Sequence, residues 1–152
     1  MQKHIENVQE FMKKAGQNVP ESLTVPDEQT RLLRAKLVME EALEMCAALG
    51  VGINPKYDGD YIESTSDLYF YIKDGVNLTE IADAAVDLLW VGVTGPMIDI
   101  GCVDKLQECV QEVDRSNLSK FIDGHRCPDS GKWIKGRSYS PANIEGILNS
   151  EI

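Results

Sequence analysis

The chain has 152 residues, of which 43% are hydrophobic and 26% charged, as in an ordinary soluble globular protein. This length suits one domain, and we expect residues 1–152 to form a single one. The formal net charge of −10 argues against a nucleic-acid polymer or an anionic membrane as a partner. No apolar run approaches the roughly 20 residues that span a bilayer. The N-terminus lacks signal-peptide features, and the four cysteines lack CxxC spacing, so we expect a cytoplasmic protein with reduced thiols.

The first third of the chain predicts two helices separated by a loop. Residues 1–15 have helical periodicity and are followed by Gly16. Their apolar face consists of Ile5, Val8, Phe11 and Met12. Asp27 is a plausible N-cap for a long helix that runs to about Leu49, before Gly50. Near its start lie Arg31, Arg34 and Lys36, which we expect to pair with acids further along the helix or to reach a phosphate.

The long helix carries three carboxylates on an otherwise apolar surface. At about 100° per residue, Glu40 and Glu44 lie within about 40° of each other, and Glu41 lies about 60° further round. Apolar residues occupy nearly every other direction, so the acids must point into a partly buried place where like charges repel. A divalent cation would reverse that penalty. From this helix alone, a solvated acidic edge is an equally good interpretation.

Residues 50–76 predict an insert between two helices. Tyr61–Thr65 and Leu68–Ile72 are rich in β-branched and aromatic residues, which favours a β-hairpin over about residues 57–73. Asp58-Gly59-Asp60 lacks the ligand series of a calcium loop, and we expect a solvent-exposed turn there.

A second acidic stripe lies on the next predicted helix. Thr79 is a candidate N-cap, and Glu80, Asp83 and Asp87 fall within about 60° at spacings of three and four. Two nearly apolar helices, each with a narrow acidic stripe, can pack so that the stripes converge. Oxygen ligands alone suit Mg²⁺, or Mn²⁺ in its place, rather than zinc or copper. We expect this helix to continue past Pro96 with a kink and to end at Gly101.

The last part of the chain is basic and poor in regular structure. Residues 103–116 predict a fourth helix, and glycines and prolines then indicate a loop-rich tail with a short hairpin around residues 132–137. Residues 115–139 contain six Lys or Arg and two Asp, in contrast to the acidic remainder. An acidic body with a basic C-terminal segment suits a metal in one place and phosphate in another.

The ordered acidic motifs resemble those of the all-α nucleoside triphosphate pyrophosphohydrolases, the MazG-like superfamily that includes dimeric dUTPases and phosphoribosyl-ATP pyrophosphohydrolase. The resemblance rests on Glu40-Glu41-x-x-Glu44, on Glu80-x-x-Asp83 and on the run from Asp83 to Val91. Residues 114–120 and 131–141 are similar to the tail of its phosphoribosyl-ATP-pyrophosphohydrolase-like branch. It implies an all-α fold, a four-to-five-helix MazG-like bundle that here carries the hairpin insert. The insert lengthens the usual gap between the motifs.

The resemblance also implies roles for individual residues. Glu41, Glu44, Glu80 and Asp83 would hold Mg²⁺, with Glu40 on a second ion or acting as the base for the attacking water. Asp87 lies outside this set, and we expect it beside the metals. In the tail, the residues expected to contact phosphate oxygens are Lys120, Lys135 and Arg137. Asn117 is the candidate contact for sugar or base, and Tyr139 could pack beside it.

The expected reaction is Mg²⁺-dependent hydrolysis of a (deoxy)nucleoside triphosphate to the monophosphate and pyrophosphate. Phosphoribosyl-ATP as the substrate and a non-catalytic metal-binding helical protein are the alternatives. A ferritin-like di-iron bundle would need Glu-x-x-His pairs, which the sequence lacks. Helices this apolar also predict a homodimer or a dimer of dimers, with the third and fourth helices in the interface.

Overall fold

A computed structural model describes residues 1–57, 61–73, 75–128 and 132–150. Contacts divide the chain into two compact units. Unit 1 comprises Met1–Val19 and Val25–Asp99, and unit 2 comprises Pro20–Thr24 and Ile100–Ile152. Each unit is described by itself below. The single domain expected over residues 1–152 stays a prediction.

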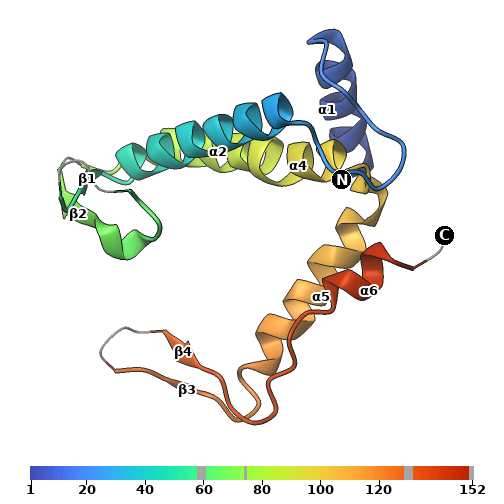
Figure 1. Ribbon diagram of the computed structural model, residues 1–152. Coiled ribbons are helices and arrows are strands. Elements are labelled where there is room, and N and C mark those ends of the chain that lie inside the picture. Colours follow the sequence, from blue (N-terminus) through green and yellow to red (C-terminus); the bar gives the residue numbers. More distant parts are fainter. Residues whose placement is uncertain (58–60, 74, 129–131, 151–152) are drawn as a thin grey trace. The chain divides into compact units, whose positions relative to one another are not determined.

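Unit 1 is built on helices, as the sequence predicts. Its elements are α1 (Gln2–Lys14), α2 (Glu28–Ala48), α3 (Leu78–Leu88), the π-helical segment η2 (Leu89–Thr94) and α4 (Gly95–Asp99). The last three follow one another without a break, and together they lie antiparallel beside α2 (Figure 1). The kink predicted at Pro96 stays a prediction, and the segment that precedes this proline is π-helical.

Caps explain where the two long helices begin. Asp27 caps α2, since its side chain accepts the Thr30 N–H at 2.7 Å, as predicted. For α3 the predicted cap is wrong, because Asn77 and not Thr79 fills this position. The Asn77 Oδ1 atom accepts the N–H groups of Thr79 and Glu80 at 3.2 and 3.3 Å, and Thr79 already lies inside the helix. An Asn at this position satisfies donors that would otherwise be orphaned.

Most of the buried residues of unit 1 lie where α1 meets α2 and η2–α4. Ile5, Val8 and Met12 are buried, whereas Phe11 is 55% exposed and meets the Trp90 ring edge-on at 5.8 Å. Arg34 donates from Nε and Nη2 to the Asp99 carboxylate at 2.7 and 3.1 Å. The expectation that Arg34 serves the acids further along α2 or a phosphate is therefore wrong, because a buried carboxylate already engages its guanidinium.

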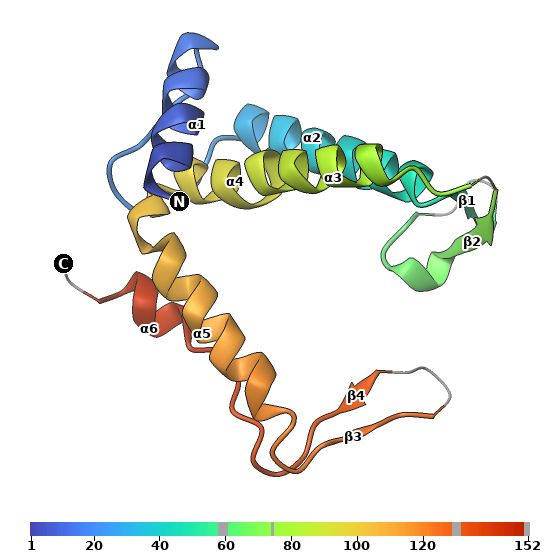
Figure 2. The same cartoon turned by 180° about the vertical axis from the view of Figure 1, so that it is seen from behind.

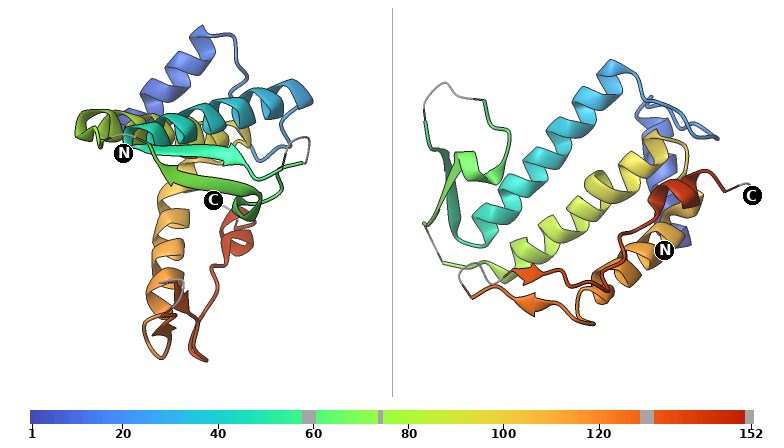
Figure 3. Two further views of the ribbon diagram at one scale, coloured as in Figure 1. Left: turned by 90° about the vertical axis from the view of Figure 1, so that its left-hand side faces the viewer. Right: turned by 60° about the horizontal axis from the view of Figure 1, so that its bottom comes forward.

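A β-hairpin separates α2 from α3, but its first strand differs from the predicted one. Strand β1 (Val51–Pro55) pairs antiparallel with β2 (Leu68–Ile72), so that Gly52 faces Tyr71 (Figure 3). Residues 61–65 do not form a strand. The Ser64 side chain instead accepts the Ser66 N–H and starts the short 3₁₀ turn Thr65–Asp67. Strand β1 begins directly after Gly50, which ends α2 in a left-handed conformation. The turn predicted at 58–60 lies outside the described residues.

The segment Leu78–Asp99 forms one helix of 22 residues that is long and apolar enough, by length and composition, to cross a membrane. The prediction that no apolar run approaches the length needed to span a bilayer is therefore wrong. A single helix of this kind is weak evidence for insertion, because helices of soluble proteins can have the same composition. Its stripe of Glu80, Asp83 and Asp87 would be costly in hydrocarbon. That the chain does not enter a membrane stays a prediction.

Unit 2 consists of one main helix and the segments that pack on it (Figure 2). Its described elements are η3 (Val103–Lys105), α5 (Leu106–Ser119), β3 (His125–Arg126), β4 (Trp133–Ile134) and α6 (Ile144–Leu148). The Lys105 ammonium donates to the Ile147 and Ser150 carbonyls at 2.9 and 2.5 Å and so caps the end of α6. The tail hairpin pairs residues 125–126 with 133–134, earlier than the predicted 132–137. The four cysteines form no disulfide.

Candidate active site

The acidic stripe of α2 contains one carboxylate whose surroundings are unusual. Glu40 and Glu44 are exposed, but Glu41 is half-buried. Its Oε2 atom is fully buried and has no hydrogen-bond partner among the described residues. A buried carboxylate oxygen without a donor is costly. Glu41 is therefore the member of the stripe at which a bound cation would change the energy most.

Charges from both helices act on Glu41, so the acidic stripes of α2 and α3 face each other. Burial is the first cause that raises the pKa of Glu41 above its ordinary value. Repulsion follows from Glu44 and Glu40 on its own helix, and from Asp87 and Asp83 on α3. Asp87, which the family resemblance leaves outside the core set, thus acts on Glu41 more strongly than Asp83 does. Glu80 is not among these charges and is exposed in the first turn of α3.

The residues present fit a hard divalent cation by their chemistry. Every donor in the two stripes is a carboxylate oxygen, which is the ligand type that Mg²⁺ and Mn²⁺ take. The unsatisfied Oε2 of Glu41 and the repulsion around it are what a cation would relieve. Within the described ranges, however, no three His, Cys, Asp or Glu side chains lie close enough together to hold an ion.

The predicted tail residues gather at the end of α5 in unit 2. The Lys120 ammonium donates to the Asn117 side-chain oxygen at 2.7 Å. The Lys135 ammonium lies 4.2 Å from the centre of the Tyr139 ring. Hydrogen bonds from Ser116 and then Lys135, together with the charges of Lys135 and Lys120, hold the pKa of Tyr139 below its ordinary value. Four of the five predicted residues therefore form one basic cluster.

The position of Arg137 relative to this cluster follows from its neighbours in the chain. It is exposed and lies between Gly136, which closely approaches Asp123, and Ser138, which is hydrogen-bonded to Asp123. The Asp123 carboxylate accepts the Ser138 N–H at 3.0 and 3.2 Å and the Ser138 hydroxyl at 3.1 Å. A side chain at Gly136 would overlap Asp123, so this approach requires glycine. Arg137 is thus held at a fixed backbone position next to the cluster of Asn117, Lys120, Lys135 and Tyr139.

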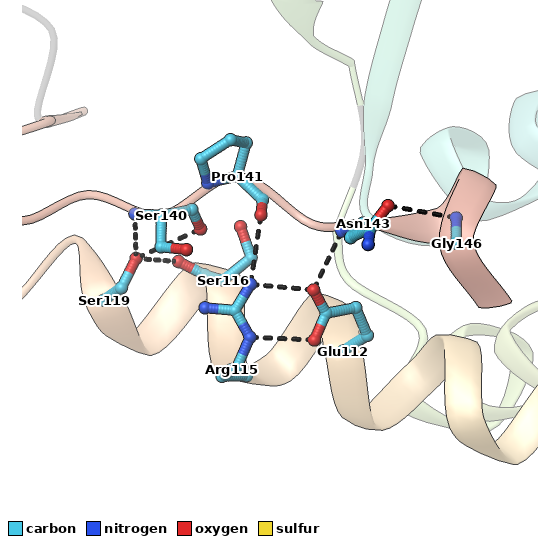
Figure 4. Close-up of polar contacts among 8 residues, drawn as sticks. All are labelled: Glu112, Arg115, Ser116, Ser119, Ser140, Pro141, Asn143 and Gly146. Carbon is cyan, nitrogen blue, oxygen red and sulfur yellow. Dashed lines mark hydrogen bonds and ion pairs between the residues drawn. The ribbon is translucent and has the colours of Figure 1, made fainter.

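The segment after this cluster is held on α5 by polar contacts that the sequence does not predict (Figure 4). Arg115 donates to Glu112 at 2.8 and 2.7 Å and to the Pro141 carbonyl at 3.0 Å. Glu112 in turn accepts the Asn143 N–H at 2.8 Å. The Ser140 N–H donates to the Ser119 hydroxyl at 2.9 Å. The only advance sign in the sequence is the i, i+3 spacing of Glu112 and Arg115, which is common on solvated helices.

Trp133 fastens the tail hairpin to the same end of α5. Its indole N–H donates to the Lys120 carbonyl at 2.7 Å, and its ring lies 4.7 Å from that of Phe121. These contacts bring strand β4, and with it Lys135, back toward the helix that carries Asn117 and Lys120. The Lys120–Asn117 and Lys135–Tyr139 pairs are each local in sequence, and contacts such as the Trp133–Lys120 hydrogen bond bring the two pairs together.

Unit 1 thus carries two facing carboxylate stripes, and unit 2 carries a basic cluster. A sequence model of the phosphoribosyl-ATP pyrophosphohydrolase family matches residues 5–117. The chain belongs to this family, which is part of the MazG-like nucleoside triphosphate pyrophosphohydrolase superfamily. It is therefore a pyrophosphohydrolase that acts on a nucleotide phosphoanhydride. No curated protein matches the sequence significantly.

The match covers the two units unequally. It contains both acidic stripes and ends at Asn117, so the tail residues from Lys120 to Tyr139 lie beyond it. Family membership therefore supports the reaction class through unit 1. The roles of Lys120, Lys135, Arg137 and Tyr139 rest on the geometry of unit 2 and on the resemblance of the tail.

Proposed function

We propose that the chain hydrolyses a (deoxy)nucleoside triphosphate to the monophosphate and pyrophosphate, with Mg²⁺ at the acidic stripes. The observation that carries this proposal is the orphaned Glu41 oxygen, surrounded by the charges of Glu44, Asp87, Glu40 and Asp83. Such an arrangement repels a nucleotide unless cations intervene. It is consistent with a site that binds its substrate as a metal complex.

The proposed roles divide the stripes between metal binding and activation of water. Glu41, Glu44, Glu80 and Asp83 hold Mg²⁺, and Asp87 lies beside them. Glu40 either holds a second ion or accepts the proton of the attacking water. When bound, the metal supplies a lowered pKa for water and neutralises charge on the phosphates. Mn²⁺ would support the same chemistry, because it accepts the same oxygen ligands.

The basic cluster of unit 2 supplies cations for the substrate's phosphates. The ammonium groups of Lys120 and Lys135 and the guanidinium of Arg137 would stabilise negative charge on the outer phosphate oxygens. Asn117 would contact the sugar or the base. Lys120 already donates to Asn117, and Lys135 already lies over Tyr139, so these side chains are partly positioned before substrate binds.

Phosphoribosyl-ATP is the second candidate substrate, because the matched family carries this name. The same α–β anhydride bond breaks and pyrophosphate leaves in both reactions, so the stripes serve either substrate. The difference lies in the group attached to the base.

We further propose that the active form is a homodimer or a dimer of dimers in the cytoplasm.

The test is a panel of the eight common nucleoside triphosphates, dUTP and phosphoribosyl-ATP with Mg²⁺, scored for pyrophosphate and orthophosphate. We expect pyrophosphate from one or a few substrates, and no turnover in EDTA. Glu44→Ala should lower kcat at least a hundredfold. Glu28→Ala is the matched control, since Glu28 is an exposed carboxylate in the first turn of the same helix.

A second readout does not depend on turnover. Thermal unfolding of the wild type should shift upward when Mg²⁺ replaces EDTA, because bound cations satisfy Glu41. Glu41→Gln should remove this shift, and Glu28→Ala should retain it. Release of orthophosphate alone, or full turnover by Glu44→Ala, would contradict the proposed function.

A further inference from the structure

A cavity of about 250 Å³ lies in unit 1 where the end of α2 meets the hairpin. Leu43, Cys46 and Ala47 form its helical wall. The remaining lining residues are Val51, Gly52 and Ile53 of β1, Tyr71 of β2 and Lys73 after it. Pockets that enclose drug-sized ligands span about 300–1,000 Å³. This cavity therefore suits one small ring system and not a whole nucleotide.

The cavity adjoins one edge of the acidic stripe of α2. Leu43 and Ala47 each follow an acid, Glu40 or Glu44, by three residues, so they lie about 60° round the helix from these acids, on the side away from Glu41 and nearer the C-terminal end. One helical turn is about 5.4 Å, a separation that a sugar spans. A nucleotide whose phosphates lie at the Glu40–Glu44 edge could thus bring its base to this cavity.

The edge of β1 offers polar groups to such a base. The Lys73 N–H donates to the Gly50 carbonyl, and the Lys56 N–H to the Asp67 carbonyl, both at 2.8 Å. In an antiparallel pair bonded residues alternate, so the N–H and C=O groups of Val51 and Ile53 point away from β2. Within the described sheet β1 has no second neighbour. Both residues line the cavity, and their donors and acceptors match those of a base edge.

Tyr71 adds an aromatic wall. A side chain at Gly52 would overlap the Tyr71 ring, so the ring packs directly on the Gly52 backbone. Every nucleobase has a π-face that can stack on such a ring, and stacking contributes substantially to nucleotide binding. The cavity therefore combines apolar side chains, one aromatic ring and an unpaired strand edge.

We propose that this cavity binds the nucleobase of the substrate, which makes the hairpin insert the element that selects the base. The inference rests on the proposed function for the position of the phosphates. The ligand would be a single nucleobase held between α2 and β1. The backbone groups of Val51 and Ile53 would form hydrogen bonds with the edge of the base.

Alkylation of Cys46 tests occupancy without turnover. Cys46 is half-buried and lines the cavity, and Cys127, half-buried in unit 2, serves as the internal control. The wild-type protein is treated with iodoacetamide and Mg²⁺ in the presence of each nucleoside monophosphate, and both sites are followed by peptide mass spectrometry. We expect at least one monophosphate to slow alkylation of Cys46 fivefold or more, whereas ribose 5-phosphate, which lacks a base, should not. Equal Cys46 rates with all monophosphates at 10 mM would overturn the proposal.

Kinetics of variants test selection. Tyr71→Ala should raise KM at least tenfold for the best substrate of the panel, with kcat within threefold. Gly52→Ala should also alter the ratio of kcat/KM between bases, since the added methyl group displaces the Tyr71 ring. Phe70→Ala, an exposed aromatic residue of the same strand outside the cavity lining, is the control and should leave this ratio unchanged. An unaltered ratio in both cavity variants would overturn the proposal.

The two proposals fail in different ways. Protection of Cys46 without pyrophosphate release from any nucleotide would retain the base site and contradict the proposed reaction. Pyrophosphate release without protection of Cys46 would retain the reaction and contradict the base site.

Discussion

Glu112 is a single residue that ties the tail to α5. A hydrogen bond from Arg115, and then the Asn143 N–H, lowers its pKa from an ordinary 4.5 to about 2. The lowered pKa means that the ionised carboxylate stabilises the folded state. This contribution is complete above pH 4.5 and is lost as the pH falls from 4.5 toward 2, because the folded state then binds the proton less readily than the unfolded chain.

The corresponding variant is Glu112→Gln, which retains the shape of the side chain but not its charge. We expect it to lower the unfolding midpoint at pH 7, with the difference from wild type shrinking as the pH falls to 3. Scanning calorimetry between pH 3 and 7 measures this difference. Glu108→Gln, on the exposed side of the same helix, is the control. A constant difference between Glu112→Gln and wild type across this range would contradict the ion-pair origin.

At the scale of elements, the start of α3 depends on Asn77. Its side-chain oxygen accepts two N–H groups of the first turn, one of them from Glu80. Asn77→Ala should lower the free energy of unfolding by about 1 kcal/mol, the usual cost of losing a cap. Asn77→Asp should retain most of the stability, since a carboxylate accepts the same bonds.

The variant Thr79→Ala tests whether the N-cap of α3 is Asn77 or Thr79, the residue that the sequence favours. If Asn77 is the cap, Thr79→Ala should change the free energy of unfolding by less than about 0.5 kcal/mol. Urea denaturation of the three variants provides the measurement. A larger loss from Thr79→Ala than from Asn77→Ala would show that the cap lies at Thr79.

The helices could be predicted from sequence because their signals are local. Apolar periodicity, Asp27 and the left-handed glycines at 16, 50 and 101 fix where the helices run, and the structure agrees to within a few residues. The first hairpin strand could not be predicted, because Val51–Pro55 contains Gly52 and Pro55 and becomes a strand only by pairing with Leu68–Ile72. Strand β1 therefore depends on a partner strand that is distant in sequence.

The candidate site shows the same division. The spacing of Glu40, Glu44, Asp83 and Asp87 is visible in the sequence, since each stripe lies on one helix. That Glu41 has a buried oxygen without a hydrogen-bond partner among the described residues is not visible, because it depends on how closely α3 packs against α2. Arg34 is a second case. Its sequence position suggests that it could bind a phosphate, but the fold shows that the buried Asp99 carboxylate already binds its guanidinium.

At the scale of the whole molecule, much apolar surface of unit 1 stays uncovered within that unit. On α2, Leu32 is 73% exposed and Met39 57%, and on α3 Val86 is 58% exposed. Scattered exposed apolar residues are normal, but two neighbouring helices with this composition are typical of an interaction surface. The long helix Leu78–Asp99 has the same property, which a partner helix explains without a membrane.

Association of two copies would bury this surface, and it predicts a homodimer or a dimer of dimers at micromolar concentration. Leu32→Lys should weaken the association, because it places a charge where apolar area would be buried, at a position outside the acidic stripes and the cavity. Light scattering coupled to size exclusion measures both species, with Gln29→Lys, which adds the same charge at an exposed position on the same helix, as the control for net charge. A monomeric wild type at this concentration would contradict the prediction.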